Sequence, residues 1–96
     1  MKPHTITLLE PAGVEYRDVV YQISMRHMKA HLGLTNYTRK TITINPRQDE
    51  EDILSTAWHE AVHVAVPMLM ENAVLAVEYN IRQMDQIVRE ALGLTE

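Results

Sequence analysis

The residues of this 96-residue chain most able to do chemistry are two histidines and a glutamate in the stretch WHEAVH, positions 58–63. On a helix, His59 and His63 lie about 6 Å apart along the axis, and their side chains project from one face. Two imidazoles at that spacing can bind one tetrahedral Zn²⁺ at about 2.0–2.1 Å. Glu60 leans toward the same side and can accept a proton from a metal-activated water without binding the metal. The stretch therefore predicts a zinc site with Glu60 as general base.

The pattern H-E-x-x-H is short and can occur by chance, so its significance depends on the segment around it. Residues 49–66 contain no glycine and no proline, and their apolar residues recur at helical spacing: Ile53, Ala57, Ala61, Val64 and Ala65. Asn45-Pro46 precedes this segment, four acidic residues at 49–52 suit its first turn, and Pro67 ends it. We therefore expect the motif on an amphipathic helix.

Length and composition restrict the class of protein. We expect one domain, residues 1–96, and the net charge of −4 without a Lys/Arg cluster argues against a nucleic-acid partner. Because there is no cysteine, a metal must be held by histidine and carboxylate side chains. The N-terminal segment lacks the apolar core of a signal peptide, and no apolar run could span a membrane. These features predict a cytoplasmic protein with no membrane partner.

Several short segments alternate apolar and polar residues and are expected to form strands: 5–9, 34–37 and 41–45. The last is the best of them, because Ile42 and Ile44 share one face and Thr41 and Thr43 the other. Pro11-Ala12-Gly13 predicts a turn after the first.

Two further helices are expected, over 19–32 with Gly33 as its stop and over 71–92 with Gly93 as its stop. The last one carries an apolar stripe that should pack against the motif helix: Val74, Val77, Ile81, Met84, Val88 and Ala91. The predicted fold class is therefore α+β, a small antiparallel or mixed sheet packed on about three helices.

A catalytic zinc site needs a third protein ligand, and no histidine follows His63. Glu71, Glu78 and Asp85 recur at intervals of seven along the last helix. If that helix runs antiparallel to the motif helix, Glu71 lies level with His63, whereas Glu78 lies about 10 Å further along the axis. Glu71 is the preferred ligand, and Glu78, Asp85, water alone or a partner's residue stay open. A carboxylate not bound to the metal can accept a hydrogen bond from a ligand imidazole.

A second histidine pair, His27 and His31, has the same spacing. Arg26 and Lys29 lie beside it and disfavour a cation there. We interpret this pair as the polar edge of a packing helix.

At this point the chain resembles the zincin metallopeptidases of the gluzincin type, over roughly residues 41–88, and its size resembles their minimal phage-type and bacterial members. The resemblance rests on HEAVH on a helix, preceded by an alternating strand and followed by a helix bearing a glutamate. It implies a zincin-like fold and zinc-dependent hydrolysis of a peptide or protein substrate. It further implies that His59, His63 and Glu71 bind the metal and that Glu60 is the general base.

The resemblance also implies that strand 41–45 pairs through a free edge with an extended substrate. Larger gluzincins carry a longer spacer to the third ligand and a Tyr or His that stabilises the oxyanion. In this sequence the oxyanion-stabilising residue can be suggested only by elimination. The candidates are Tyr37, Tyr79, His4 and His27. Two other functions stay open: a zinc-stabilised, catalytically idle binding module, and a metal-free interaction protein whose last helix binds a partner. The sequence does not indicate an oligomeric state.

Overall fold

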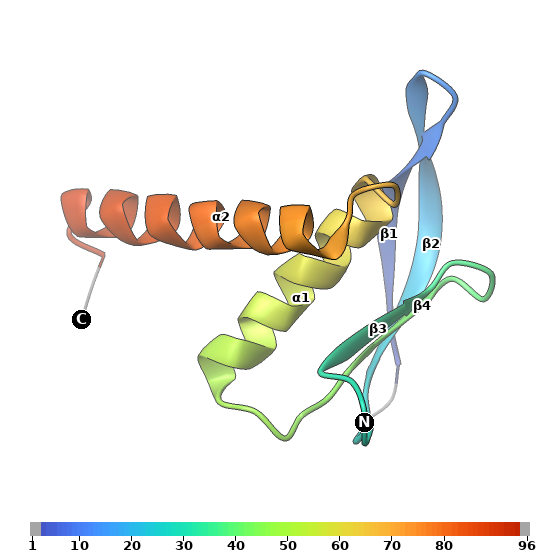
Figure 1. Ribbon diagram of the computed structural model, residues 1–96, viewed down its shortest axis with the longest axis horizontal. Helices are drawn as coiled ribbons and strands as arrows, with labels where there is room; N and C mark the ends of the chain where they lie inside the picture. The colour runs from blue at the N-terminus through green and yellow to red at the C-terminus, as the bar shows by residue number, and fades with distance from the viewer. Residues whose placement is uncertain (1–2, 95–96) are drawn as a thin grey trace.

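The computed structural model describes residues 3–94 and consists of a four-stranded sheet and two helices (Figure 1). The elements are β1 (His4–Ala12), β2 (Glu15–Met25), β3 (Gly33–Asn36), β4 (Thr41–Ile44), α1 (Glu50–Ala65) and α2 (Glu71–Ala91). The strands lie in the order β1-β2-β4-β3. β1 pairs antiparallel with β2, β2 parallel with β4, and β3 antiparallel with β4, so the sheet is mixed.

The core lies between one face of the sheet and α1. Strand alternation places Tyr21, Ile42 and Ile44 on the face toward α1, where they pack with Val64 of that helix. α1 contacts β1, β3 and β4, and α2 crosses α1 (Figure 1). The motif helix thus packs on both the sheet and a second helix.

The prediction of a helix over 19–32 is wrong. These residues form most of β2 and the loop that leads to β3. Val19, Tyr21, Ile23 and Met25 are the more buried residues of this stretch, which is the period of a strand. β2 pairs with β1 on one side and β4 on the other, and these two ladders decide between strand and helix.

The expected fold class therefore needs correction. The class α+β and a mixed sheet are found, but residues 3–94 form two helices and not about three. The zincin-like arrangement of helices over a sheet is accordingly wrong for this chain. Gly33 is also not a helix stop, since it begins β3.

Other local predictions are confirmed. β1, β3 and β4 contain most of the segments expected as strands, although the first turn lies at Gly13 and Val14, just after the predicted position. α1 ends at Ala65, directly before Val66 and Pro67, and acidic residues occupy its first turn. α2 ends one residue earlier than expected, and Gly93 follows in the left-handed conformation with φ 71°.

The free edge expected for strand 41–45 is wrong, because β4 lies between β2 and β3.

α2 is attached to the body only near its beginning. Among the described elements it contacts only α1, and Val74 is its one buried residue. Its remaining length runs past α1 and the sheet (Figure 1). The stripe expected to pack on the motif helix does so only at its N-terminal end. No helix within residues 3–94 is long and apolar enough to cross a membrane.

A buried ionic cluster joins the two hairpins at one end of the sheet. Glu10 accepts a hydrogen bond from the Tyr21 hydroxyl, and Lys40 Nζ lies 3.0 and 2.9 Å from its two carboxylate oxygens. Arg17 lies 3.6 Å away on the exposed side. The Tyr21 hydrogen bond, together with Lys40 and Arg17, lowers the pKa of Glu10 below its ordinary value, although burial opposes this.

Glu10→Gln tests this cluster. The pKa of Glu10 is lowered in the folded state, so the stabilisation is fully present above the unfolded value near 4.5 and is lost as pH falls through the folded value. At pH 7 we expect the variant to lose roughly 1–3 kcal/mol of unfolding free energy, the range for disrupted hydrogen bonds of a buried group. Urea unfolding at pH 7 and at successively lower pH measures the difference. It should shrink on acidification, whereas Glu15→Gln, at an exposed carboxylate of β2, should cost little at any pH. A difference that grows on acidification would contradict the assignment.

Candidate metal centre

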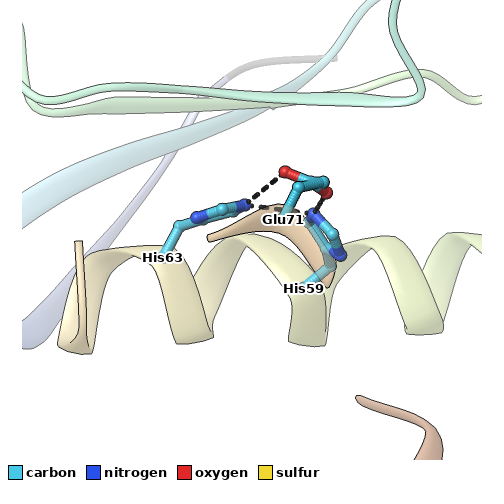
Figure 2. Close-up of side chains that lie close together, drawn as sticks. All are labelled: His59, His63 and Glu71. Atoms are coloured by element: carbon cyan, nitrogen blue, oxygen red, sulfur yellow. Dashed lines mark hydrogen bonds and ion pairs between the residues drawn. The ribbon is translucent and has the colours of Figure 1, made fainter. Parts of the chain in front are cut away.

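α1 presents His59 and His63 from one side, and the first residue of α2 closes over them (Figure 2). The two Nε2 atoms lie 3.1 Å apart. Glu71 Oε1 lies 2.5 Å from Nε2 of His59, and Glu71 Oε2 lies 3.3 Å from Nε2 of His63. Figure 2 shows the two rings and the carboxylate converging on one small volume.

These three side chains fit a metal ion. One ligand atom from each lies within 4.8 Å of the others. Ligand atoms bonded to one tetrahedral Zn²⁺ at 2.0–2.1 Å are about 3.3 Å apart, close to the separations of 3.1 Å between the two Nε2 atoms and 3.3 Å between His63 and Glu71. Two imidazoles and one carboxylate are a ligand set of catalytic zinc. The imidazoles are mostly buried, whereas 63% of the Glu71 side chain is exposed, so the cluster is open on the Glu71 side.

A contact on the other ring nitrogen of His59 also supports a metal site. Its Nδ1 lies 3.1 Å from Glu78 Oε2, and because a carboxylate can only accept, Nδ1 carries the proton. In a neutral imidazole, Nε2 then has a lone pair, and this lone pair faces the Glu71 oxygen 2.5 Å away. Two acceptors that close require a proton or a metal ion between them. The His59–Glu78 contact is also the kind that orients a metal-binding imidazole.

The two glutamates that the sequence left as alternatives thus take different places. Glu71 contacts both Nε2 atoms, and Glu78 contacts only the Nδ1 side of His59. Asp85 pairs with Arg89 at 2.7 Å. The crossing of α2 over α1 decides this, since it brings the start of α2 to the level of both histidines.

Glu60 points to the other side of the cluster, toward β3. It is buried, with 5% of its surface exposed, and its Oε1 accepts a hydrogen bond of 2.8 Å from Thr35 Oγ1. Thr35 pairs with Ile42, so strand alternation aims its side chain at α1. The sequence analysis missed Thr35, because no local pattern relates residue 35 to residue 60.

Gly33 allows β3 to lie close to Glu60. A Cβ atom at this position would lie 2.5 Å from Thr56 Cγ2 and 3.1 Å from Glu60 Oε2. A side chain would therefore push β3 away from α1 at the point where Thr35 binds Glu60. Glycine is required here by a close approach and not by a special backbone angle.

The cluster lies where two clefts meet. A cleft of about 630 Å³ runs between α1, α2 and the loop before β3, and one of about 390 Å³ lies beside β3. The residues that line both are His31, Gly33, His59, Glu60 and Glu71. A molecule in the smaller cleft would contact all three candidate metal ligands and the candidate base, and one in the larger cleft would contact His59, Glu71 and Glu60.

Of the residues considered for the oxyanion, Tyr37 lines the smaller cleft. Its hydroxyl donates to the backbone oxygen of His63 at 3.0 Å. Burial, and then the negative charges of Glu60, Glu10 and Glu71, raise the pKa of Tyr37, so its proton is retained at neutral pH. His4 begins β1, His27 lies in the loop after β2, and Tyr79 is exposed on α2. His31, which the sequence analysis placed on a helix, lies in the same loop and lines both clefts.

Comparison of the chain with models of protein families, with curated proteins and with solved structures gave no match. Its function is therefore inferred from the side chains of the cluster and the clefts.

Metal binding is the first prediction from this cluster. We expect one zinc ion per chain by calorimetric titration, and loss of that ion in His59→Ala, because one of three ligands is removed. Glu78→Gln should weaken binding by about 10–100-fold, since it replaces the charged carboxylate that accepts from Nδ1 of His59 with a neutral amide. Glu90→Gln makes the same chemical change on an exposed part of α2 and should leave the affinity unchanged. Equal affinity in His59→Ala and the unmodified protein would contradict the site.

Gly33→Ala tests the close approach of β3 to α1. We expect it to lower the free energy of unfolding by about 1–3 kcal/mol, because the new methyl group overlaps Thr56. Thr56→Ser removes the overlapping Cγ2 atom and keeps the hydroxyl that binds Gln48 and Asp52. Added to Gly33→Ala, it should restore part of the loss in urea unfolding. If Gly33→Ala leaves stability unchanged, β3 does not lie where the structure has it.

Proposed function

We propose that this protein is a zinc-dependent metallopeptidase that hydrolyses peptide bonds in peptide or protein substrates. The observation that carries the proposal is the convergence of His59, His63 and Glu71 beside Glu60 in one cleft. When bound, Zn²⁺ would polarise a carbonyl oxygen and lower the pKa of water toward about 7. The likeness to gluzincins is proposed on HEAVH and Glu71 alone, and not on the fold.

In this proposal Glu60 handles the proton. Its carboxylate lines both clefts, so a water and a peptide bound beside the cluster would lie within its reach. It would accept a proton from that water and deliver it to the nitrogen of the leaving amine. The hydrogen bond from Thr35 holds one carboxylate oxygen and leaves Oε2 for this task. Thr35 is thus a positioning residue for Glu60.

The sheet offers an edge for an extended substrate. β3 is the outermost strand on the side of the cluster, and Gly33, Leu34 and Thr35 line the smaller cleft. We propose that a substrate strand pairs with the exposed edge of β3, which replaces β4 in this role. Tyr37, just after this strand, lines the same cleft and would donate to the developing oxyanion if its hydroxyl turned from the backbone oxygen of His63.

A second candidate function is the zinc-stabilised module without catalysis. It is favoured by the weak attachment of α2, which contacts only α1 among the described elements. A metal held by His59, His63 and Glu71 would join the two helices and stabilise the domain. The cytoplasmic location expected from the sequence stays a prediction.

Glu60→Gln distinguishes the two functions. We expect the variant to keep one zinc ion per chain and to lose about 10²–10⁴-fold in hydrolysis of a peptide library, because the amide cannot accept the proton. Mass spectrometry of the products and elemental analysis of the protein measure both effects. Glu90→Gln serves again as the matched control, with activity intact. Full turnover in Glu60→Gln would remove Glu60 from the mechanism, and stoichiometric zinc without turnover in the unmodified protein would favour the idle module.

A further inference from the structure

The outer part of α2 carries an apolar stripe with no partner among residues 3–94. We define the α2 stripe by the residues Val77, Ile81, Met84, Val88 and Ala91. Met84 is 66% exposed and Val88 48%, and Ile87 and Leu92 beside them are exposed as well. Contiguous apolar surface of this kind on a folded chain marks an interaction site.

The α2 stripe lies on the part of the helix that leaves the body. Figure 1 shows α2 continuing beyond α1 and the sheet, and Val74, near its start, is the residue it buries. An isolated helix of this length is only marginally stable in water, and most helical stability comes from packing of an apolar face. The outer half of α2 therefore needs a partner to be a stable helix.

The positions of the charged residues on α2 are compatible with a second copy of the chain as the partner. The α2 stripe contains no charged residue, and the charged residues of this half lie on other faces of the helix: Arg82, Asp85, Arg89 and Glu90. Asp85 and Arg89 also pair with each other within the helix, at 2.7 Å. Two identical stripes can thus meet without burying a charged residue of either stripe between them.

The spacing selects the same partner. From Val77 to Ala91 the stripe advances by alternating steps of four and three residues, the repeat of coiled coils. Ile81 and Val88 occupy one position of this repeat, and Val77, Met84 and Ala91 occupy the other. A copy of the same helix provides a matching repeat over the same length.

We infer that the α2 stripe is a dimer interface in which it packs against the α2 stripe of a second copy of this chain. Such an interface is isologous, with one two-fold axis. The cleft side of α2, formed by Glu71, Leu75, Glu78 and Arg82, lies roughly 130° around the helix from the stripe. Dimerisation therefore leaves the candidate metal centre open, and it does not depend on the proposed function.

Sedimentation equilibrium of the full chain tests this inference. We expect the unmodified protein, with a chain mass of 11.1 kDa, to behave as a dimer at micromolar concentrations. The double variant Met84→Glu with Val88→Glu should be monomeric, with a dissociation constant raised on the order of 100-fold or more, because it buries charges without partners. The double variant Gln83→Glu with Gln86→Glu adds the same two charges at exposed positions outside the stripe and should stay dimeric.

Two further measurements on the double variant distinguish loss of the dimer from loss of the fold. Zinc titration should give one site in the double variant, as in the unmodified protein, because the metal cluster lies on the other side of α2. Far-ultraviolet circular dichroism should show lower helicity in the double variant, since the outer half of α2 loses its packing. A monomeric unmodified protein would overturn the inference and leave the stripe to another partner. A double variant that stays dimeric would overturn it too.

Discussion

The packing of α1 on the sheet is the constraint on which the rest of this structure depends. One side of the helix is turned toward the sheet, and the buried residues on it are Ser55, Thr56, Glu60 and Val64. Because successive residues rotate by about 100°, His59 and His63 project from a neighbouring side of the helix into the cleft beside β3, where Glu71 of α2 meets them (Figure 2). Glu60 binds Thr35 of β3 and the imidazoles meet the start of α2, so the three side chains of the motif line one cleft.

Burial of Glu60 between α1 and the sheet lowers the stability of the fold. A carboxylate between helix and sheet loses its hydration, and an apolar side chain there would be easier to accommodate. Thr35 supplies one hydrogen bond, and Gly33 leaves the space that lets β3 come close enough to give it. A local arrangement that works against stability and is supported by specific neighbours is typical of functional sites.

α2 combines two tasks on different faces. Its beginning supplies Glu71 and Glu78 to the histidines of α1, and its outer half carries an apolar stripe that the rest of residues 3–94 leaves exposed. Few apolar contacts hold α2 to α1. The position of α2 therefore depends also on the contacts of its polar residues and on the proposed contacts with a second copy. The metal cluster and the stripe are therefore expected to support one another through the order of α2, although neither contains residues of the other.

The sequence by itself determined the parts that depend on near neighbours along the chain. Helical spacing and Pro67 predicted α1, the alternation of residues 41–45 predicted β4, and a regular stripe with Gly93 predicted α2. Only the tertiary structure decided that residues 15–25 form a strand, that β3 is the edge strand, that Thr35 binds Glu60, and that Glu71 and Glu78 divide between the two sides of the histidines. These outcomes depend on strand pairing and on the crossing of two helices, which join residues far apart in the chain. Residues 19–25 do carry the alternation of a strand, but only pairing with β1 and β4 decided it against a helix.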